Sequence, residues 1–534
     1  MNSEQERSRS LWMEVPPLDF PALASDQNAD VLVIGAGIAG LSAAYELARL
    51  RRGVIVVDRG RLGRGMSART SGHLAFEIDD FFHELIQSHG VDAARAWYRS
   101  QCSAVDRIEA VCRDEGIDCD FKRVDALLFA ASESDVEYLH KELEAARAAG
   151  FSDAEWADAG RIVGSDRPAI RFPRQARFHP VKYLNGLVAA LQRLGAKLYA
   201  STAIEALEER DDQIVASTDA GREIRARQVI VATNSPFHLR IPIHTKQAPY
   251  RTYVIAAPIP KGTVDDVLLW DTAEPAYHYV RLQPGRTEDM LIVGGEDHKS
   301  GIIRDGAAPV ARLEAWARRH WPQMGAVAHA WSGQILEPAD YVGFAGRSPR
   351  YDHVYLVSGD SGEGLTTGVA AAMLVGDLMM SGATPWAQLY APSRQMHRGL
   401  TAYLKENLDA VRHWAELLGR GDVDSLDDIE PSHGARIRLG GQQVAAYRDE
   451  TGQLHLRSAV CTHAGCAVHW NAFERCWDCP CHGSQFGIDG QVLNGPAARP
   501  LAEVDVVPQA GPAPKARDPS HRAPRGGTHW KRGP

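Results

Sequence analysis

The alternation of apolar and polar residues predicts two regions of different architecture. Near the start, residues 31–34 and 54–57 have the pattern of buried strands, and residues 39–50 between them have apolar positions at helical spacing. A strand, a helix and a second strand in this order are typical of a parallel βαβ unit. From about residue 442 the pattern changes to short strands separated by Gly and His turns, which predicts an all-β region.

The middle of the chain mixes the two patterns. We predict mainly helices over residues 76–165 and strands over residues 196–232 and 250–300. A last strand at 354–357 leads through a glycine-rich turn into an apolar helix over 368–380. Residues 396–423 have the pattern of a helical connection, so the boundary between the α/β region and the all-β region is expected near 395–425.

Length and charge narrow the class of protein. A chain of 534 residues exceeds what one core of roughly 250–300 residues can hold, so several domains are expected. The net charge of −9 argues against a nucleic-acid partner. The sequence has neither a signal-like N-terminus nor an apolar run of roughly 20 residues, so we expect a cytoplasmic protein without a membrane span.

A glycine motif follows the first strand. Gly35, Gly37 and Gly40 fit G-x-G-x-x-G between that strand and the helix, and Asp58 ends the second strand. Such glycines allow a tight turn, close approach to a pyrophosphate and close helix–strand packing. The helix N-terminus then attracts phosphate, and the acidic residue accepts hydrogen bonds from a ribose diol. The motif alone does not distinguish FAD from NAD.

Further motifs connect this region to one family. The segments GRGMSARTSGHLAF (63–76), FHPVKYLNGL (178–187), VIVATNSP (229–236) and YLVSGDSGEGLTTGVAAAMLVGDLM (355–379) occur in this order. Together they resemble the D-amino-acid oxidase-like flavoproteins, which include glycine, sarcosine and γ-glutamylputrescine oxidases. The resemblance covers about residues 29–395 and implies FAD. The residues it implies for FAD binding are Gly35, Gly37, Gly40, Asp58, Arg59, Arg69, Thr70, His73, Gly362, Gly364, Leu365 and Thr366.

A second dinucleotide site is an alternative for the later glycines. Gly362, Gly364 and Gly368 have the spacing G-x-G-x-x-x-G, which could serve NAD(P)H. No acidic residue follows them at the distance that a ribose-binding carboxylate requires.

The C-terminal cysteines and histidines form the second motif. Cys461 and His463 give C-x-H, and after fifteen intervening residues Cys479 and His482 give C-x-x-H. Two thiolates and two imidazoles suit a Rieske [2Fe–2S] cluster, and zinc is the alternative. The segments CTHAGC and CPCHGSQF resemble both cluster-binding loops of Rieske proteins. That resemblance, over about residues 424–508, implies the [2Fe–2S] cluster and a disulfide that joins the two remaining loop cysteines, Cys466 and Cys481.

The flavoprotein resemblance implies oxidation of a carbon next to nitrogen. An amino-acid substrate would also need a cation for its carboxylate. The candidate substrate residues lie in the predicted strands over residues 250–300: Arg251, Tyr253, His278, Arg281 and Lys299.

The predicted fold class is α/β, with an FAD-binding Rossmann-like domain, an interleaved α+β substrate domain and a C-terminal all-β Rieske domain. The predicted organisation is an N-terminal arm (1–28), the FAD-dependent oxidoreductase domain (29–395), a helical linker (396–423), the Rieske domain (424–508) and a disordered basic tail (509–534).

The predicted function is a dehydrogenase of a secondary amine or amino acid. Its electrons would pass from FAD through the Rieske cluster to an external one-electron acceptor, either a protein or a quinone. Two alternatives are an NAD(P)H-fed flavin and Rieske reductase and a non-catalytic redox sensor or electron-transfer adaptor.

Overall fold

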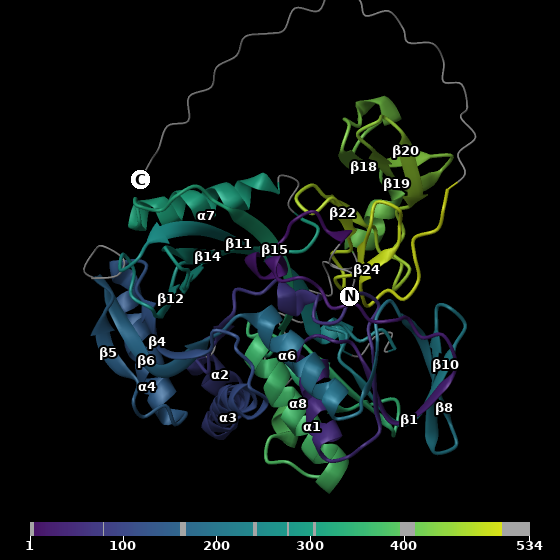
Figure 1. Ribbon diagram of the computed structural model, residues 1–534. Helices are drawn as coiled ribbons and strands as arrows, with labels where there is room; N and C mark the ends of the chain where they lie inside the picture. Colours follow the sequence, from purple (N-terminus) through teal and green to yellow (C-terminus); the bar gives the residue numbers. More distant parts are fainter. Residues whose placement is uncertain are drawn as a thin grey trace, which may run out of the picture.

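The computed structural model describes residues 5–77, 79–160, 167–238, 243–274, 277–302, 306–395 and 412–504. Two large sheets with their helices form the body, and two small antiparallel sheets form a C-terminal part beside it (Figure 1). The predicted basic tail and residues 396–411 of the predicted linker lie outside the described residues. Residues 412–415 of that linker are helical and continue into a 3-10 turn, η6 (Glu416–Leu418).

An eight-stranded sheet carries the βαβ unit. Its path is β16–β17–β10–β1–β2–β7, and the strands from β17 to β7 are parallel. Residues 31–34, 54–57 and 229–231 of these strands are apolar throughout because both of their faces are buried. The strands of this sheet are β1 (Gln27–Ile34), β2 (Val54–Val57), β7 (Lys197–Tyr199), β8 (Ile204–Arg210), β9 (Gln213–Thr218), β10 (Glu223–Val231), β16 (Phe344–Arg347) and β17 (Val354–Ser358).

Helices cover one face of this sheet, and the β8–β9 hairpin packs against the other. The helices around the sheet are α1 (Ile38–Arg49), α3 (Val91–Glu115), α6 (Pro180–Arg193) and α8 (Gly364–Ser381). Among the described residues, α8 alone is long and apolar enough to cross a membrane, but 61% of its apolar window is buried inside the protein. It packs against α1 and α3, as a core helix does.

A nine-stranded sheet forms the second layer of the body. Its path is β15–β11–β14–β13–β12–β4–β6–β3, and β5 pairs with β6. Its strands are β3 (His73–Leu74), β4 (Lys122–Phe129), β5 (Glu155–Asp158), β6 (Pro168–Arg177), β11 (Gln247–Pro260), β12 (Leu268–Asp271), β13 (His278–Gln283), β14 (Glu288–Lys299) and β15 (His329–Pro338). Helix α7 (Ala307–His320) packs on one face of this sheet, and the core that includes α3 lies on the other.

The mainly helical prediction for residues 76–165 is confirmed for three helices and misses two strands. The helices are α2 (Phe82–His89), α3 and α4 (Val136–Ala148), and the missed strands are β4 and β5. Strand β4 has an apolar end, Ala126 to Phe129, that is too short for its periodicity to separate a strand from a helix.

The C-terminal part is all β, as predicted. Its first sheet contains β18 (His433–Leu439), β19 (Gln442–Arg448) and β20 (Leu454–Ser458). Its second sheet contains β21 (His469–Asn471), β22 (Cys476–Asp478), β23 (Gln485–Phe486) and β24 (Val492–Asn494). The all-β pattern begins at His433, earlier than the expected residue 442.

The N-terminal segment lies between the two parts. The 3-10 turn η2 (Leu11–Glu14) buries Trp12 completely, and the indole nitrogen donates a hydrogen bond of 2.6 Å to the Thr70 carbonyl. The Arg7 amide donates one of 3.1 Å to the Glu474 carbonyl in the C-terminal part. Residues 5–14 therefore contact both the flavoprotein-like body and the all-β part.

Candidate functional site

The loop between β1 and α1 has the geometry that a dinucleotide phosphate requires. Gly35 has a φ of +103°, and a Cβ atom there would lie 2.3 Å from the Ala232 carbonyl oxygen. A Cβ at Gly40 would lie 1.9 Å from the Gly35 carbonyl oxygen. Only glycine therefore lets α1 approach β1 so closely. Gly37, at the start of α1, lines a cavity in front of this loop.

Asp58 fixes the glycine loop and also lines the cavity. Its Oδ2 accepts a hydrogen bond of 2.7 Å from the Ala36 amide, and its Oδ1 accepts one of 2.8 Å from the Gly60 amide. The carboxylate is 5% exposed and lies beside Arg59 on the cavity wall. This is the position expected for a residue that binds a ribose diol.

All but one of the predicted FAD-binding residues line this same cavity. The exception is Gly40, whose place is behind the loop, at the contact of α1 with β1. The predicted residues on the wall are Gly35, Gly37, Asp58, Arg59, Arg69, Thr70, His73, Gly362, Gly364, Leu365 and Thr366. Gly368 lies on this wall too, so the three glycines of the alternative NAD(P)H motif belong to the same cavity and do not form a separate one.

The start of α8 supplies a second helix end to the cavity. Helix α8 begins at Gly364, and Leu365 and Thr366 of its first turn line the wall. Free N–H groups and a partial positive charge at a helix N-terminus stabilise negative charge on a bound group. The cavity therefore fits FAD. The start of α1 suits the pyrophosphate, the start of α8 suits the flavin ring, and Asp58 suits the ribose.

The far end of the cavity is built by the nine-stranded sheet. Four residues of this sheet lie on the wall with His73: Thr252, Trp270, Tyr279 and Asp297. The Thr252 and Tyr279 hydroxyls lie 2.9 Å apart, within hydrogen-bond distance. Burial lowers the pKa of His73 to about 3, and the nearby Arg281 adds to this shift. His73 is therefore neutral at physiological pH.

Two buried carboxylates stand at this end. The Tyr277 hydroxyl donates a hydrogen bond of 3.0 Å to Asp79 Oδ2. Burial raises the pKa of Asp79 to about 6 and that of Asp297 to about 7. Sequence reasoning missed both residues. Asp297 lies between Glu296 and His298 near the end of β14, so its sequence surroundings are polar and do not distinguish it from an exposed acidic residue.

The five predicted substrate residues are placed elsewhere, since none is among the residues that line the cavity. Arg251 donates hydrogen bonds to the Ser332 hydroxyl, at 2.7 Å, and to the Asp478 carboxylate, at 3.1 and 3.2 Å. Tyr253 stacks on His298, with ring centroids 5.4 Å apart. Arg251 and Tyr253 flank Thr252 on β11. Successive side chains of a strand point to opposite faces, so Thr252 reaches the cavity wall and its two neighbours point away from it.

The other three predicted residues also have different surroundings. His278 lies 2.8 Å from the Asp271 carboxylate and stacks on Trp316. Arg281 donates hydrogen bonds to the Gly72 carbonyl, at 2.7 Å, and to the Phe178 carbonyl, at 2.9 Å. Lys299 ends β14, away from the wall.

The second motif places its four side chains in two pairs in the C-terminal part. The rings of His463 and His482 are 5.1 Å apart, and the Cys461 and Cys479 thiols are hydrogen-bonded to each other. That bond lowers the pKa of the Cys461 thiol below its ordinary value. One pair of thiols and one pair of imidazoles fit the ligand set of a Rieske cluster, in which the two histidines hold one of the two irons.

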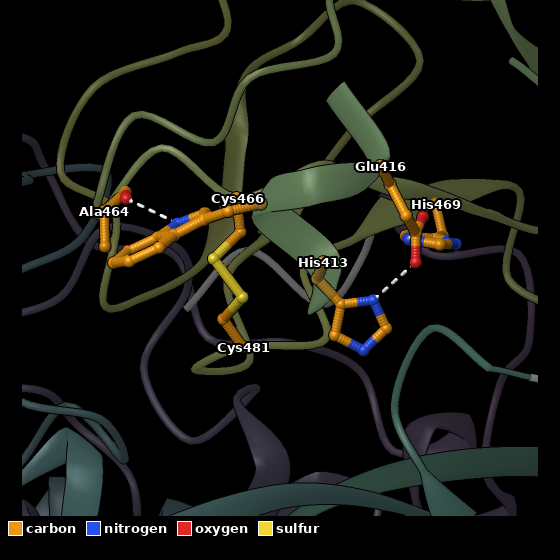
Figure 2. Close-up of a disulfide and its surroundings, with 7 residues drawn as sticks. His413, Glu416, Ala464, Cys466, His469 and Cys481 are labelled. Carbon is orange, nitrogen blue, oxygen red and sulfur yellow. Dashed lines mark hydrogen bonds and ion pairs between the residues drawn. A yellow bond between two sulfur atoms is a disulfide. The ribbon is translucent and has the colours of Figure 1, made fainter. Parts of the chain in front are cut away.

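A disulfide joins the two loops. Cys466 and Cys481 are bonded to each other, as Figure 2 shows. The same view contains His413, Glu416 and His469, three side chains that could also hold a metal ion. Glu416, however, also accepts a hydrogen bond of 2.6 Å from Arg436. The group therefore forms an ion-pair network around one carboxylate.

Buried charged side chains connect the C-terminal part to the flavin cavity. Arg69, which lines the cavity, lies 2.6 Å from Glu6 of the N-terminal segment and 3.3 Å from Glu474 of the C-terminal part. All three side chains are fully buried. Asn494 also donates a hydrogen bond of 2.6 Å to Gln334 on β15, and Gln334 donates one of 2.9 Å to the Gly483 carbonyl.

Comparison with known proteins agrees with this geometry. Residues 30–378 match the family "FAD dependent oxidoreductase", and residues 420–507 match the family "Rieske [2Fe-2S] domain". A Bacillus subtilis protein described as a putative Rieske 2Fe-2S iron-sulfur protein, YhfW, is 31% identical over 94% of this chain and 98% of its own length.

Two further relatives match the flavoprotein region. The γ-glutamylputrescine oxidoreductase of Escherichia coli is 25% identical over 68% of this chain and 86% of its own length. The crystal structure of glycine oxidase from Geobacillus kaustophilus has a TM-score of 0.59 and 19% identity, and covers 69% of this chain and 99% of its own. The chain therefore belongs to the FAD-dependent oxidoreductase family and carries a C-terminal Rieske [2Fe–2S] domain.

Proposed function

We propose that the chain is a dehydrogenase of a secondary amine or amino acid that passes electrons through its Rieske cluster to an external one-electron acceptor, either a protein or a quinone. When bound, FAD supplies a hydride acceptor and the cluster supplies one-electron transfer. Glycine oxidase and γ-glutamylputrescine oxidoreductase, to which the chain is similar, carry nitrogen compounds in their names.

One observation carries the electron route. Four residues of the C-terminal Rieske domain line the same cavity as the FAD-binding residues: Leu493, Asn494, Gly495 and Ala497. Arg59, beside Asp58, donates a hydrogen bond of 3.4 Å to the Val492 carbonyl. Residues of the Rieske domain thus form part of the wall of the FAD cavity within one chain, an arrangement that supports direct transfer between the two cofactors.

The lining at the substrate end favours an amine. Asp79 and Asp297 lie there, whereas Arg69 is held by Glu6 and Glu474. Within the described part of the chain, the substrate end has carboxylates for a cationic nitrogen and no arginine or lysine placed to bind a substrate carboxylate. A positively charged amine would therefore bind better than a substrate whose affinity depends on its carboxylate.

Asp297 is the proposed proton acceptor. A carbon can give up a hydride only when its neighbouring nitrogen is neutral, so a protonated amine must first lose its proton. Burial raises the pKa of Asp297 to about 7, which suits a general base near neutral pH. The nitrogen proton would pass to the carboxylate and the hydride to FAD, and water would hydrolyse the resulting iminium.

The test is anaerobic stopped-flow mixing with a panel of amines, amino acids and NADH. We expect amines to bleach the flavin, and we expect Asp297→Asn to slow this by about 10²- to 10⁴-fold while the absorption of bound flavin stays unchanged. The exposed Asp153→Asn variant is the control. Bleaching by NADH alone would favour the reductase alternative, and bleaching by none of the compounds would favour the sensor alternative.

The cellular location stays a prediction. We expect a cytoplasmic protein, although a disulfide such as Cys466–Cys481 is uncommon in that compartment. Cell fractionation with an antibody would test it, and recovery in the membrane or periplasmic fraction would contradict it.

A further inference from the structure

One histidine of the flavoprotein body contacts both histidines of the cluster motif. The His244 ring lies 4.8 Å from the His463 ring, edge-on at 77°, and 5.7 Å from the His482 ring. His244 begins η5 (His244–Lys246), the short turn before β11, and is 2% exposed. A residue from outside the Rieske part therefore packs against both predicted imidazole ligands.

The same histidine is connected to the wall of the flavin cavity. The Ser235 hydroxyl lies 3.3 Å from His244 Nδ1, and Ser235 lines the cavity. The Ser358 hydroxyl fixes the neighbouring residue by donating a hydrogen bond of 2.8 Å to the Asn234 carbonyl. The His244 ring thus contacts both Ser235 on the cavity wall and the His463 ring.

The second cluster loop is seated on the body at further points. A Cβ atom at Gly483 would lie 2.9 Å from both Pro249 and Gln334, so this loop packs tightly against β11 and β15. A Cβ at Gly301 would lie 3.3 Å from Pro480. Both ring nitrogens of His463 are buried in the folded chain.

We propose that His244 is a positioning residue that seats the imidazole side of the cluster on the wall of the flavin cavity. The two ligand histidines would then hold the cluster on the side of the flavin cavity, and we expect an external acceptor to dock on another side of the Rieske domain. The contact also sets the orientation of the ligand rings, and outer contacts of this kind tune metal centres. The part of this proposal that concerns electron entry rests on the proposed function, whereas the contact itself does not.

The test compares His244→Ala with His244→Phe, which keeps a ring at this place. His238→Ala is the matched control, since His238 is also buried and lies in the same region but packs against Phe237 and Tyr351. Three quantities are measured on the full chain with both cofactors: the EPR spectrum of the dithionite-reduced cluster, the midpoint potential of the cluster, and the rate at which flavin photoreduced with EDTA passes an electron to the cluster.

We expect His244→Ala to change the EPR spectrum, shift the midpoint potential and slow the internal transfer by about 10- to 100-fold. His244→Phe should recover most of the loss, and His238→Ala should match the wild type. Loss of iron from His244→Ala, with iron retained in His238→Ala, would also support the proposal. The His244 ring would then be the group that holds the two ligand histidines in place.

Two results would overturn the proposal. One is an unchanged spectrum, potential and rate in a fully loaded His244→Ala variant. The other is an equal loss of iron in His238→Ala, which would indicate general damage to this region. If wild-type flavin never reduces the cluster, the proposed electron route fails, while the spectrum and potential still decide the role of His244.

Discussion

Arg69 and Glu474 form a buried ion pair of 3.3 Å that joins the flavin cavity to the Rieske part. Removal of one partner of a buried pair costs about 3–5 kcal/mol when the other charge is left without compensation. Arg69 keeps Glu6 at 2.6 Å. We therefore predict that Glu474→Ala lowers the free energy of unfolding by less than this amount, measured by denaturant titration. Glu474→Gln, which keeps the shape and one acceptor, should cost less.

The control for this prediction is Glu208→Ala, which breaks an exposed pair with Arg210. It should leave the unfolding free energy unchanged, because exposed pairs contribute little. Equal effects of the Glu474 and Glu208 variants would mean that the buried pair does not hold the two parts together.

A second prediction concerns the glycine loop. Gly40→Ala would place a Cβ 1.9 Å from the Gly35 carbonyl oxygen, so α1 must move away from β1. We expect this variant to lose most of its FAD, measured by the ratio of flavin to protein absorption. Gly376→Ala in α8 is the control, since its Cβ would meet only Glu46 at 3.8 Å. That variant should keep FAD and gain about 0.5–1 kcal/mol of stability.

The iron content separates the cluster ligands from another nearby cysteine. Cys461→Ser should remove the cluster and about two irons per chain, and it should leave the flavin absorption in place. Cys476 is also buried in the Rieske part but is outside the ligand motif, so Cys476→Ser should keep its iron. Metal analysis that finds zinc in the wild type, or iron loss in both variants, would contradict the assignment.

The raised pKa of Asp297 predicts how stability changes with pH. Burial raises this pKa from the ordinary 3.8 to about 7, so the folded chain holds a proton that the unfolded chain releases. The stability contributed by the neutral carboxyl is complete below about pH 4 and is lost as the pH rises through about 7. The thermal midpoint of Asp297→Asn should therefore fall less than that of the wild type between about pH 5 and 8. Parallel curves for the two proteins would show that Asp297 ionises normally.

The sequence was sufficient for sites that are local in the chain. The glycine loop lies within one βαβ unit, and the cluster ligands lie within two short loops, so spacing located both sites and the resemblance to known families indicated their cofactors. Both regions also match family models. The fold class could also be predicted, because the βαβ unit and the short C-terminal strands are local patterns in the sequence.

The substrate end could not be predicted because both faces of the nine-stranded sheet are buried. Val254 faces one core and Tyr253 the other, and both side chains are apolar enough for either. Alternation therefore fixes which residues share a face but not which face meets the cavity. Glu6 accepts a hydrogen bond from Gln485, and His244 packs against His463. Both of these partners are more than 200 residues away in the sequence, so no local pattern encodes the contacts.

The central claim is that electrons pass within one chain from the flavin to the Rieske cluster. The most direct measurement is anaerobic mixing of the wild type with an amine that bleaches the flavin, with absorption and freeze-quench EPR recorded on the same sample. The account predicts that the flavin bleaches first and that the cluster signal then grows at a rate independent of protein concentration. A cluster that stays oxidised beside fully reduced flavin, or a rate proportional to protein concentration, would contradict the account.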